Sequence, residues 1–311
     1  KFNKYPVKTE LKGFPCLIDD IIGGLELIEG DPEIRKLLTE RVWSALNPPF
    51  DFEVTPSTYI TKAHRVLKSY YGRDNLFSEL RDKCNRAGID VAQAVRREVS
   101  PLADKERFCR LVKWAIAGNE LDFRTVGTGY QLTCEDFYRL VRETADKNLC
   151  LDESPLLFDS LPSVHRVLYV LDNVGEVALD ALLIEEFLKK GIKVDVVYRG
   201  GAITSDVVLG DLDQVGITKL PVELVLAGPD TLGISFQEAS PQFKSSLERA
   251  DLTVAKGQAN YYEFSRNFGS YRSRVVHLFR TKCDLVTTRF GFRGKVGIAA
   301  ELREEFLGSR W

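Results

Sequence analysis

From about residue 152 onward, the sequence alternates between short apolar runs and segments of helical length. The apolar runs are rich in β-forming residues: HRVLYVLDN, IKVDVVYRGG, VELVLAG, ADLTVAKG and SRVVHLFRTK. Alternation of this kind indicates strand–helix–strand units, whose crossovers are right-handed and whose strands are parallel. It therefore predicts an α/β fold, with a Rossmann-like, mostly parallel sheet and helices on both of its faces.

The first half of the chain has helical patterning and few strand signals. Asp31 is a favourable N-cap followed by proline, and apolar residues then recur at three- and four-residue steps from Ile34 to Leu46. A chain of 311 residues is long enough for two ordinary domains. We predict an all-helical N-terminal domain over residues 1–155 and a Rossmann-like α/β domain over residues 156–311, which carries the functional site.

Composition excludes several classes of partner. The net charge of −2 gives no basic footprint for nucleic acid, and no apolar stretch is long enough to span a membrane. Residues 1–13 do not have the pattern of a signal peptide. The six cysteines form no CxxC pair, and the three histidines have no metal-ligand spacing. We expect a cytoplasmic protein that binds neither nucleic acid nor membrane.

Polar residues follow four of the predicted strands, at the point where each strand ends. In an open parallel sheet, the carboxyl ends of the strands are where ligands bind. The residues concerned are Asp172, Asn173, Asp206, Lys256, Gln258, Asn260 and Lys282. Two carboxylates, an amide and lysines at one edge are suited to a divalent metal ion and a phosphate group.

The carboxylates and the amide are the expected ligands of the metal ion. Asp172, Asn173 and Asp206 offer hard oxygen ligands of the kind that Mg²⁺ or Mn²⁺ prefers. Glu176, one helical turn later, could accept a hydrogen bond from a metal-bound water. Lys256 offers a point charge for phosphate, and Gly257 permits close approach of the backbone. Taken singly, each motif is also explained by helix capping, a plain turn or a surface cation.

Other ligand-binding signatures are missing from the sequence. It contains no GxGxxG, no GxxxxGK[ST] and no GxSxG motif, which removes support for dinucleotide, P-loop and α/β-hydrolase sites. A haloacid-dehalogenase phosphatase needs DxDx after its first strand, whereas this chain has DNVGE, with Val174 at the second aspartate position.

Several segments together resemble the damage-control phosphatase family, long called domain of unknown function 89. These segments are LYVLDNVGE, GGAITSD, ADLTVAKGQANYYE, LFRTKC and AGNELDF. The similarity is greatest to its archaeal and bacterial branch. It implies a helical domain packed on a Rossmann-like domain, and hydrolysis of phosphate monoesters of small, damaged or side-product metabolites. It also implies one divalent ion, Mg²⁺, Mn²⁺, Co²⁺ or Ni²⁺, held by Asp172, Asn173 and Asp206.

The resemblance also assigns the substrate contacts. The phosphate lysine corresponds to Lys256, which with Asp172 and Asp206 makes the expected catalytic set. The expected substrate-binding residues are Asn119, Lys256, Gly257, Gln258, Asn260 and Lys282. Two features depart from that branch. Cys16 has no partner in a CxxC motif, and the loop before Asp206 has Ala202 and Ser205 in place of proline and asparagine.

The expected function is therefore metal-dependent phosphatase activity on a small phosphorylated metabolite. The attacking group is either a metal-bound water or the carboxylate of Asp172. Two alternatives remain open: a sensor that binds a phosphorylated metabolite without turnover, and an S-adenosylmethionine-dependent methyltransferase. The methyltransferase would lack the glycine-rich loop that such enzymes have after the first strand.

Overall fold

The computed structural model describes residues 14–46, 51, 53–123 and 134–307. Within them, seven strands form one sheet in the order β1-β7-β6-β5-β2-β3-β4. The strands are β1 (Leu151–Asp152), β2 (Arg166–Val170), β3 (Lys193–Tyr198), β4 (Glu223–Leu226), β5 (Leu252–Lys256), β6 (Arg274–Arg280) and β7 (Gly297–Glu301). The five strands from β6 to β4 are parallel, whereas β7 runs antiparallel to β6 and pairs in parallel with β1.

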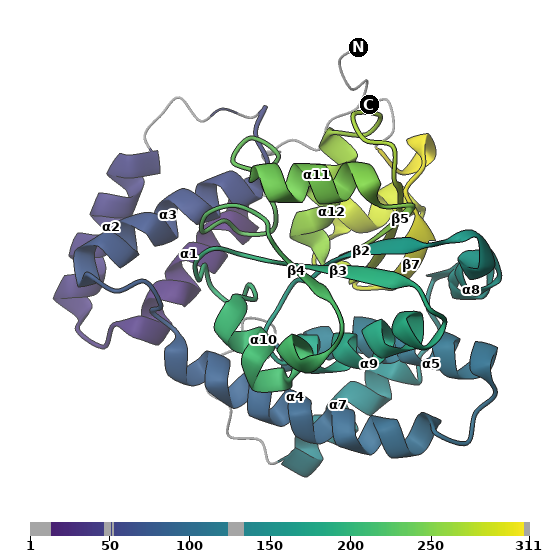
Figure 1. Cartoon of the computed structure of the whole chain (residues 1–311). Coiled ribbons are helices and arrows are strands. Elements are labelled where there is room, and N and C mark those ends of the chain that lie inside the picture. The colour runs from purple at the N-terminus through teal and green to yellow at the C-terminus, as the bar shows by residue number, and fades with distance from the viewer. Residues whose placement is uncertain (1–13, 47–50, 52, 124–133, 308–311) are drawn as a thin grey trace.

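Helices cover both faces of this sheet (Figure 1). On one face, α5 (Asp104–Ala117) and α9 (Glu176–Lys189) lie against the sheet, and α4 (Ser78–Val99), α7 (Cys134–Ala145) and α10 (Leu209–Val215) pack around them. The other face of the sheet carries α11 (Pro241–Arg249), α12 (Gln258–Arg266) and α13 (Asp284–Thr287). The short helix α8 (Ser154–Ser160) packs near α5. Single 3₁₀ turns occur at Gly118–Leu121, Leu161–Ser163, Ile217–Lys219, Thr288–Phe290 and Glu304–Phe306. The predicted mostly parallel α/β sheet with helices on both faces is confirmed.

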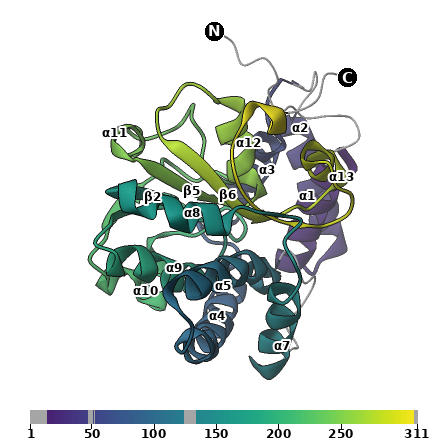
Figure 2. The same ribbon diagram turned by 90° about the vertical axis from the view of Figure 1, so that its right-hand side faces the viewer.

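The remaining three helices, α1 (Phe14–Ile28), α2 (Pro32–Leu46) and α3 (Pro56–Tyr71), form a separate lobe beside the sheet. In Figure 2 this lobe lies behind α12 and α13, and Thr55, just before α3, contacts Glu263 of α12 at 3.3 Å. Its own apolar core includes Leu17, Leu38 and Leu67. No helix in the described part of the chain is long and apolar enough to cross a membrane.

The helical half and the sheet share one core. Buried residues of α4, α5 and α7 pack with those of α9 and with one face of β2, β3 and β5. Gly88 of α4 lies so close to the chain at the start of α9 that an added Cβ would stand 2.2 Å from the oxygen of Gly175. The chain already enters the sheet at β1, before the predicted boundary at residue 155. This shared core therefore runs across that boundary.

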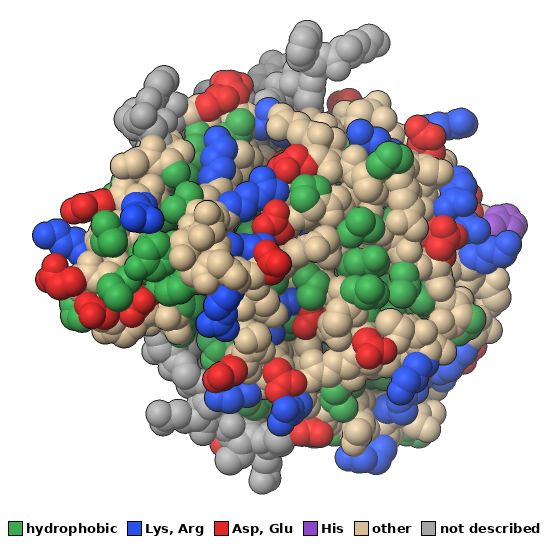
Figure 3. All heavy atoms as spheres, turned by 60° about the vertical axis from the view of Figure 1, so that its left-hand side comes forward, with side chains coloured by type: hydrophobic (Ala, Val, Ile, Leu, Met, Phe, Trp, Pro, Cys, Tyr) green, Lys and Arg blue, Asp and Glu red, His purple; other side chains and the backbone are tan. Residues whose placement is uncertain are grey.

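Ion pairs join the α1–α3 lobe to the loop after β4. Arg65 of α3 contacts Asp230 at 2.9 Å and Glu238 at 3.0 Å, and Lys68 contacts Asp230 at 2.5 Å. Basic and acidic side chains gather near the middle of the face on which this lobe comes forward (Figure 3). The pairs with Asp230 are half-buried, so they fix the lobe against the carboxyl edge of the sheet.

Candidate functional site

The chain reverses its direction of travel across the sheet between β2 and β5, and this is where Asp172 lies. From β2 the chain adds β3 and β4 on one side, and then β5 and β6 on the other. Asp172 and Asn173 follow the end of β2 after one intervening residue, and Gly257 follows β5. Gly257 has φ 78° and ψ 160°, and a Cβ placed on it would stand 1.9 Å from Oδ2 of Asp172. The Asp172 carboxylate therefore packs on a backbone that only glycine can provide.

The loop after β3 runs alongside the segment after β2. The amide of Val174 donates to the carbonyl of Ser205 at 2.8 Å, and the amide of Val207 donates to the carbonyl of Asp172 at 2.9 Å. These bonds place Asp206 opposite Asn173, with which it forms an isolated antiparallel bridge. Two segments that are more than thirty residues apart in the sequence thus become neighbours at the carboxyl edge of the sheet.

Asp206 is fully buried, and only one of its carboxylate oxygens is occupied. Its Oδ2 accepts hydrogen bonds from Nε of Arg199 at 3.0 Å and from the amide of Gly233 at 2.6 Å. Its Oδ1 is buried without a hydrogen-bond donor among the described residues. A buried anionic oxygen without a donor is costly in the free protein, so it is a ready ligand for a cation.

Asn173 is held between its neighbours. Its Oδ1 accepts a hydrogen bond from Oγ of Ser205 at 2.9 Å, and its Nδ2 donates to Oδ2 of Asp172 at 2.6 Å. The same Nδ2 reaches Oδ1 of Asn119 at 3.5 Å. Asn119 thus contacts the site through Asn173 and does not line the cavity.

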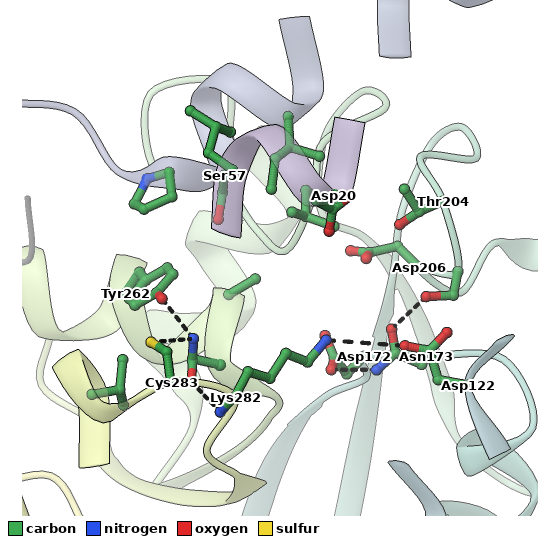
Figure 4. A pocket seen from close by; sticks show the side chains of 18 of the residues that line it. Asp20, Ser57, Asp122, Asp172, Asn173, Thr204, Asp206, Tyr262, Lys282 and Cys283 are labelled. Carbon is green, nitrogen blue, oxygen red and sulfur yellow. Dashed lines mark hydrogen bonds and ion pairs between the residues drawn. The ribbon is translucent and has the colours of Figure 1, made fainter. Parts of the chain in front are cut away.

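A cavity of about 290 Å³ opens in front of these groups, between the sheet edge and the α1–α3 lobe. Figure 4 shows Asp172, Asn173 and Asp206 along one side, Lys282 reaching across the floor, and Ser57 and Asp20 above. The other polar lining residues are Asp19, Asp122, Thr204, Ser205, Gln258, Tyr262, Cys283 and Arg289. Leu17, Pro56, Ile60, Leu232, Ala259, Leu285 and Val286 complete the wall.

The carboxylates of the site are hard to ionise without a cation. Burial, together with the charge of Asp172, raises the pKa of Asp206 to about 7, although the nearby guanidinium of Arg199 opposes the shift. Burial likewise raises the pKa of Asp172, although Lys282, Arg199 and Lys256 oppose the shift. Two neighbouring carboxylates with raised pKa values mark a place where positive charge is favoured.

Lys282 supplies positive charge to the cavity, which Arg289 also lines. Burial lowers its pKa, but the carboxylates of Asp122, Asp172 and Asp20 outweigh that effect and the pKa is raised. Its Nζ lies 4.0 Å from Oδ2 of Asp122, and its backbone amide donates to Oε1 of Gln258 at 2.8 Å. Lys282 therefore stays protonated at neutral pH and is held near the Asp172 carboxylate.

The structure does not bring Lys256 into the cavity. Its ammonium is buried, pairs with Glu176 and with Asp180 at 2.8 Å, and donates to the carbonyl of Ala115 at 2.9 Å. The reason is the alternation of side chains along β5: Leu252, Val254 and Lys256 share the face that packs on α9. The same contact turns Glu176 away from the cavity, where sequence reasoning placed it beside a metal-bound water.

The predicted substrate residues of the segment after β5 separate in the same way. Gln258 lines the cavity, whereas Gly257 supports Asp172 from below. Asn260 is buried and binds structurally: its Nδ2 donates to the carbonyls of Leu171 and Lys256, at 3.1 and 2.7 Å. The side chain of Cys16 lies outside what the structure describes.

Sequence reasoning missed the support that α4 gives to the site. Arg81 is buried, and its guanidinium donates to the carbonyls of Thr204 at 2.8 Å and Asp206 at 2.9 Å while pairing with Asp211. Thr204 has φ 47°, an uncommon value for a residue other than glycine. Nothing in the spacing of a helical arginine signals a partner more than 120 positions away. Asp20 and Asp122 were missed for the same reason.

The donor set fits a hard divalent cation better than a zinc-type centre. Among the described residues, no group of three or more His, Cys, Asp or Glu side chains is arranged to hold a metal ion. Asp172, Asn173 and Asp206 nevertheless lie together with carboxylate and amide oxygens, and Oδ1 of Asp206 is without a donor. Two carboxylates and one amide suit an ion that keeps positions for water and phosphate.

Comparison with known proteins is consistent with this geometry. A 26% identical protein of Methanocaldococcus jannaschii, described as uncharacterized, aligns over 94% of both chains. A damage-control phosphatase of Pyrococcus horikoshii is 27% identical over 90% of this chain and 93% of its own. The crystal structure of a domain-of-unknown-function 89 protein from the same organism superposes with a TM-score of 0.84 at 25% identity, covering 95% of this chain and 99% of that one.

The resemblance to the damage-control phosphatase family is confirmed by a family model that matches nearly the whole chain. The model of the damage-control phosphatase ARMT1-like domain matches residues 9–295. A damage-control phosphatase of Archaeoglobus fulgidus is also 26% identical over 89% of this chain. The chain therefore belongs to the damage-control phosphatase ARMT1-like domain family.

Proposed function

We propose that this protein is a metal-dependent phosphatase that hydrolyses phosphate monoesters of small, damaged or side-product metabolites. Two relatives are named damage-control phosphatases, which supports a phosphatase role. The observation that carries the proposal is the buried, donorless Oδ1 of Asp206 in the cavity that Asp172 and Asn173 also line. The expected partner is a small phosphorylated metabolite, and a cytoplasmic location stays a prediction.

Asp172, Asn173 and Asp206 would hold the metal ion, with Mg²⁺, Mn²⁺, Co²⁺ and Ni²⁺ as the candidates. A divalent ion bound there neutralises the two carboxylates and polarises a phosphoryl oxygen. The protein's own contribution is to keep the ligands in place. Gly257 supports the Asp172 carboxylate, Arg199 and Gly233 fix one oxygen of Asp206, and Ser205 orients Asn173.

Lys282 takes the phosphate role that the sequence had given to Lys256. It is the lysine that lines the cavity, and it stands near Asp172, where charge develops on a transferred phosphoryl group. The amino end of α12, where Gln258 and Ala259 line the cavity, adds the partial positive charge of a helix N-terminus. Lys256 instead anchors β5 to α9 by its pairs with Glu176 and Asp180.

The test is phosphatase activity of Asp172→Ala and Asp206→Ala against a panel of sugar phosphates, nucleotides and cofactor phosphates, with added Mn²⁺ or Co²⁺. We expect turnover by the wild type that a chelator abolishes, and a loss of at least about 100-fold in both variants. Asp213→Ala, at an exposed aspartate of α10, is the matched control and keeps its activity. Full activity in both site variants would contradict the proposal, and metal-dependent binding without turnover would favour a sensor.

A further inference from the structure

Ser57 places an unused hydroxyl in the cavity, on the side opposite the sheet. Its side chain is only 5% exposed, and its Oγ has no hydrogen-bond partner among the described residues. Figure 4 shows this hydroxyl pointing into the cavity from the α1–α3 lobe. Buried hydroxyls are normally hydrogen-bonded, so one that faces a cavity without a partner indicates a missing ligand atom.

The same point in the chain is the N-terminus of a long helix whose first turn is left open. α3 has sixteen residues and begins with Pro56, which has no N–H. Thr55 precedes it but its side chain does not cap the helix, because its Oγ1 is directed to Oε1 of Glu263 at 3.3 Å. The amide of Thr58 bonds the carbonyl of Thr55, whereas no acceptor is found for the amide of Ser57 within the described residues.

Two independent features therefore meet at Ser57: a buried hydroxyl without a partner and a backbone amide without an acceptor among the described residues. Helix N-termini carry partial positive charge and bind carboxylates and phosphates through such amides. A ligand atom at this place is consequently an acceptor, and an anionic one gains most.

The acidic residues nearby do not cancel this preference. Asp20 interacts electrostatically with Lys282, so its charge is directed to the floor of the cavity. Asp19 is exposed, where water and salt screen its charge. Glu263 is occupied by Thr55 and by the amide of Phe236, and it does not line the cavity.

We propose that Ser57 and the N-terminus of α3 form a subsite for a second oxyanion, a carboxylate or a second phosphate, on the alcohol part of the substrate. This inference rests on the proposed function and names the substrate class: a monoester with its scissile phosphate at Asp172 and Asp206, and another acidic group at the α1–α3 lobe. A cavity of about 290 Å³ holds a small metabolite that reaches both ends.

The experiment uses phosphate monoesters of ω-hydroxycarboxylic acids of two to five carbons, each compared with the monophosphate and the bisphosphate of the matching diol. In the wild type we expect kcat/KM to favour the acidic ester over the diol monophosphate by about tenfold or more at one chain length. A hydrogen bond to a charged group has about this effect. In Ser57→Ala this ratio falls at least fivefold. Thr58→Ala removes a neighbouring first-turn hydroxyl that does not line the cavity, and it retains the wild-type ratio.

The arms of the test separate this inference from the proposed function. A preference for the carboxylate or for the bisphosphate identifies which oxyanion the subsite takes. Turnover of the diol monophosphates with no preference at any length overturns the subsite and leaves the phosphatase intact. If no monoester is hydrolysed, calorimetry in Mn²⁺ compares the corresponding ω-phosphonocarboxylates with simple alkylphosphonates. Tighter binding of the phosphonocarboxylates that is lost in Ser57→Ala supports the subsite. Equal binding of the two classes overturns it.

Discussion

Replacing Gly257 by alanine tests the link between the backbone after β5 and the chemistry of the cavity. The new Cβ would stand 1.9 Å from Oδ2, 2.1 Å from Cγ and 2.5 Å from Oδ1 of Asp172. An ordinary contact begins near 3.4 Å, so the carboxylate or the backbone must retreat by about 1.5 Å. A shift of that size removes Asp172 from the position that it shares with Asn173 and Asp206.

The magnitude follows from the geometry. A displacement of about 1 Å in a reacting group can lower the rate by about 100-fold, so we expect kcat/KM of Gly257→Ala to fall by at least that factor. The backbone at φ 78° and ψ 160° adds a strain of about 1–3 kcal/mol, which lowers Tm by several degrees in a protein that still folds. Mn²⁺ affinity, measured by calorimetry, falls together with the activity.

Gly216→Ala is the control for the cost of a positive φ. Gly216 has φ 84°, and nothing lies within 4 Å of a Cβ placed on it. This variant loses about 1 kcal/mol of stability and keeps both its activity and its metal affinity. If Gly257→Ala retained kcat/KM within threefold and bound Mn²⁺ as tightly as the wild type, the support of Asp172 by this glycine would be refuted.

Four further perturbations separate structure from chemistry. Lys256→Met leaves the carboxylates of Glu176 and Asp180 buried without their cation, so the free energy of unfolding should fall by about 3–5 kcal/mol and Tm should fall with it. Lys282→Ala should instead abolish turnover with little change in Tm, because Lys282 lines the cavity. Arg81→Ala should weaken Mn²⁺ binding and stability together, because two carbonyls lose their donor, and equal Mn²⁺ affinity in calorimetry would count against that role. Burial raises the pKa of Asp206 from 3.8 to about 7. Between these two pH values the native state holds a proton that the unfolded state has lost. The metal-free protein should therefore lose stability as the pH rises from about 4 to about 7. Urea unfolding in chelator should show this slope, and a slope that Asp206→Asn leaves unchanged would assign it to other groups.

The position of the site could be predicted from the sequence because it depends on strand ends. Carboxyl ends of parallel strands meet at one edge, so Asp172, Asn173 and Asp206 were expected together, and the structure brings them together. Gly257 was expected to permit close approach, and it does so under the Asp172 carboxylate. The metal and catalytic roles of these residues stay predictions until the variants are measured.

Lys256 shows what a strand-end argument leaves out. It marks the end of β5 correctly, but the last residue of a strand points to one face only, and here that face packs on α9. The partners that decide its role, Glu176 and Asp180, are spaced one helical turn apart and were available in the sequence. The sequence could not show that α9 packs on that face of β5, because this follows from the three-dimensional path of the crossover.

The candidate site is divided between two hydrophobic cores, so its two walls can change independently of each other. The proposed metal ligands follow strands of the sheet and are supported by Arg81 of α4, within the large core that the helical half shares with the sheet. Ser57 and Ile60 belong instead to the α1–α3 lobe, which has its own core and meets the rest through half-buried ion pairs at Asp230. Substitutions in α1 and α3 can therefore reshape the cavity wall on the lobe side without disturbing Asp172, Asn173 and Asp206, which follow β2 and β3. Under the proposed function, one phosphoryl-transfer centre can in this way serve different leaving groups.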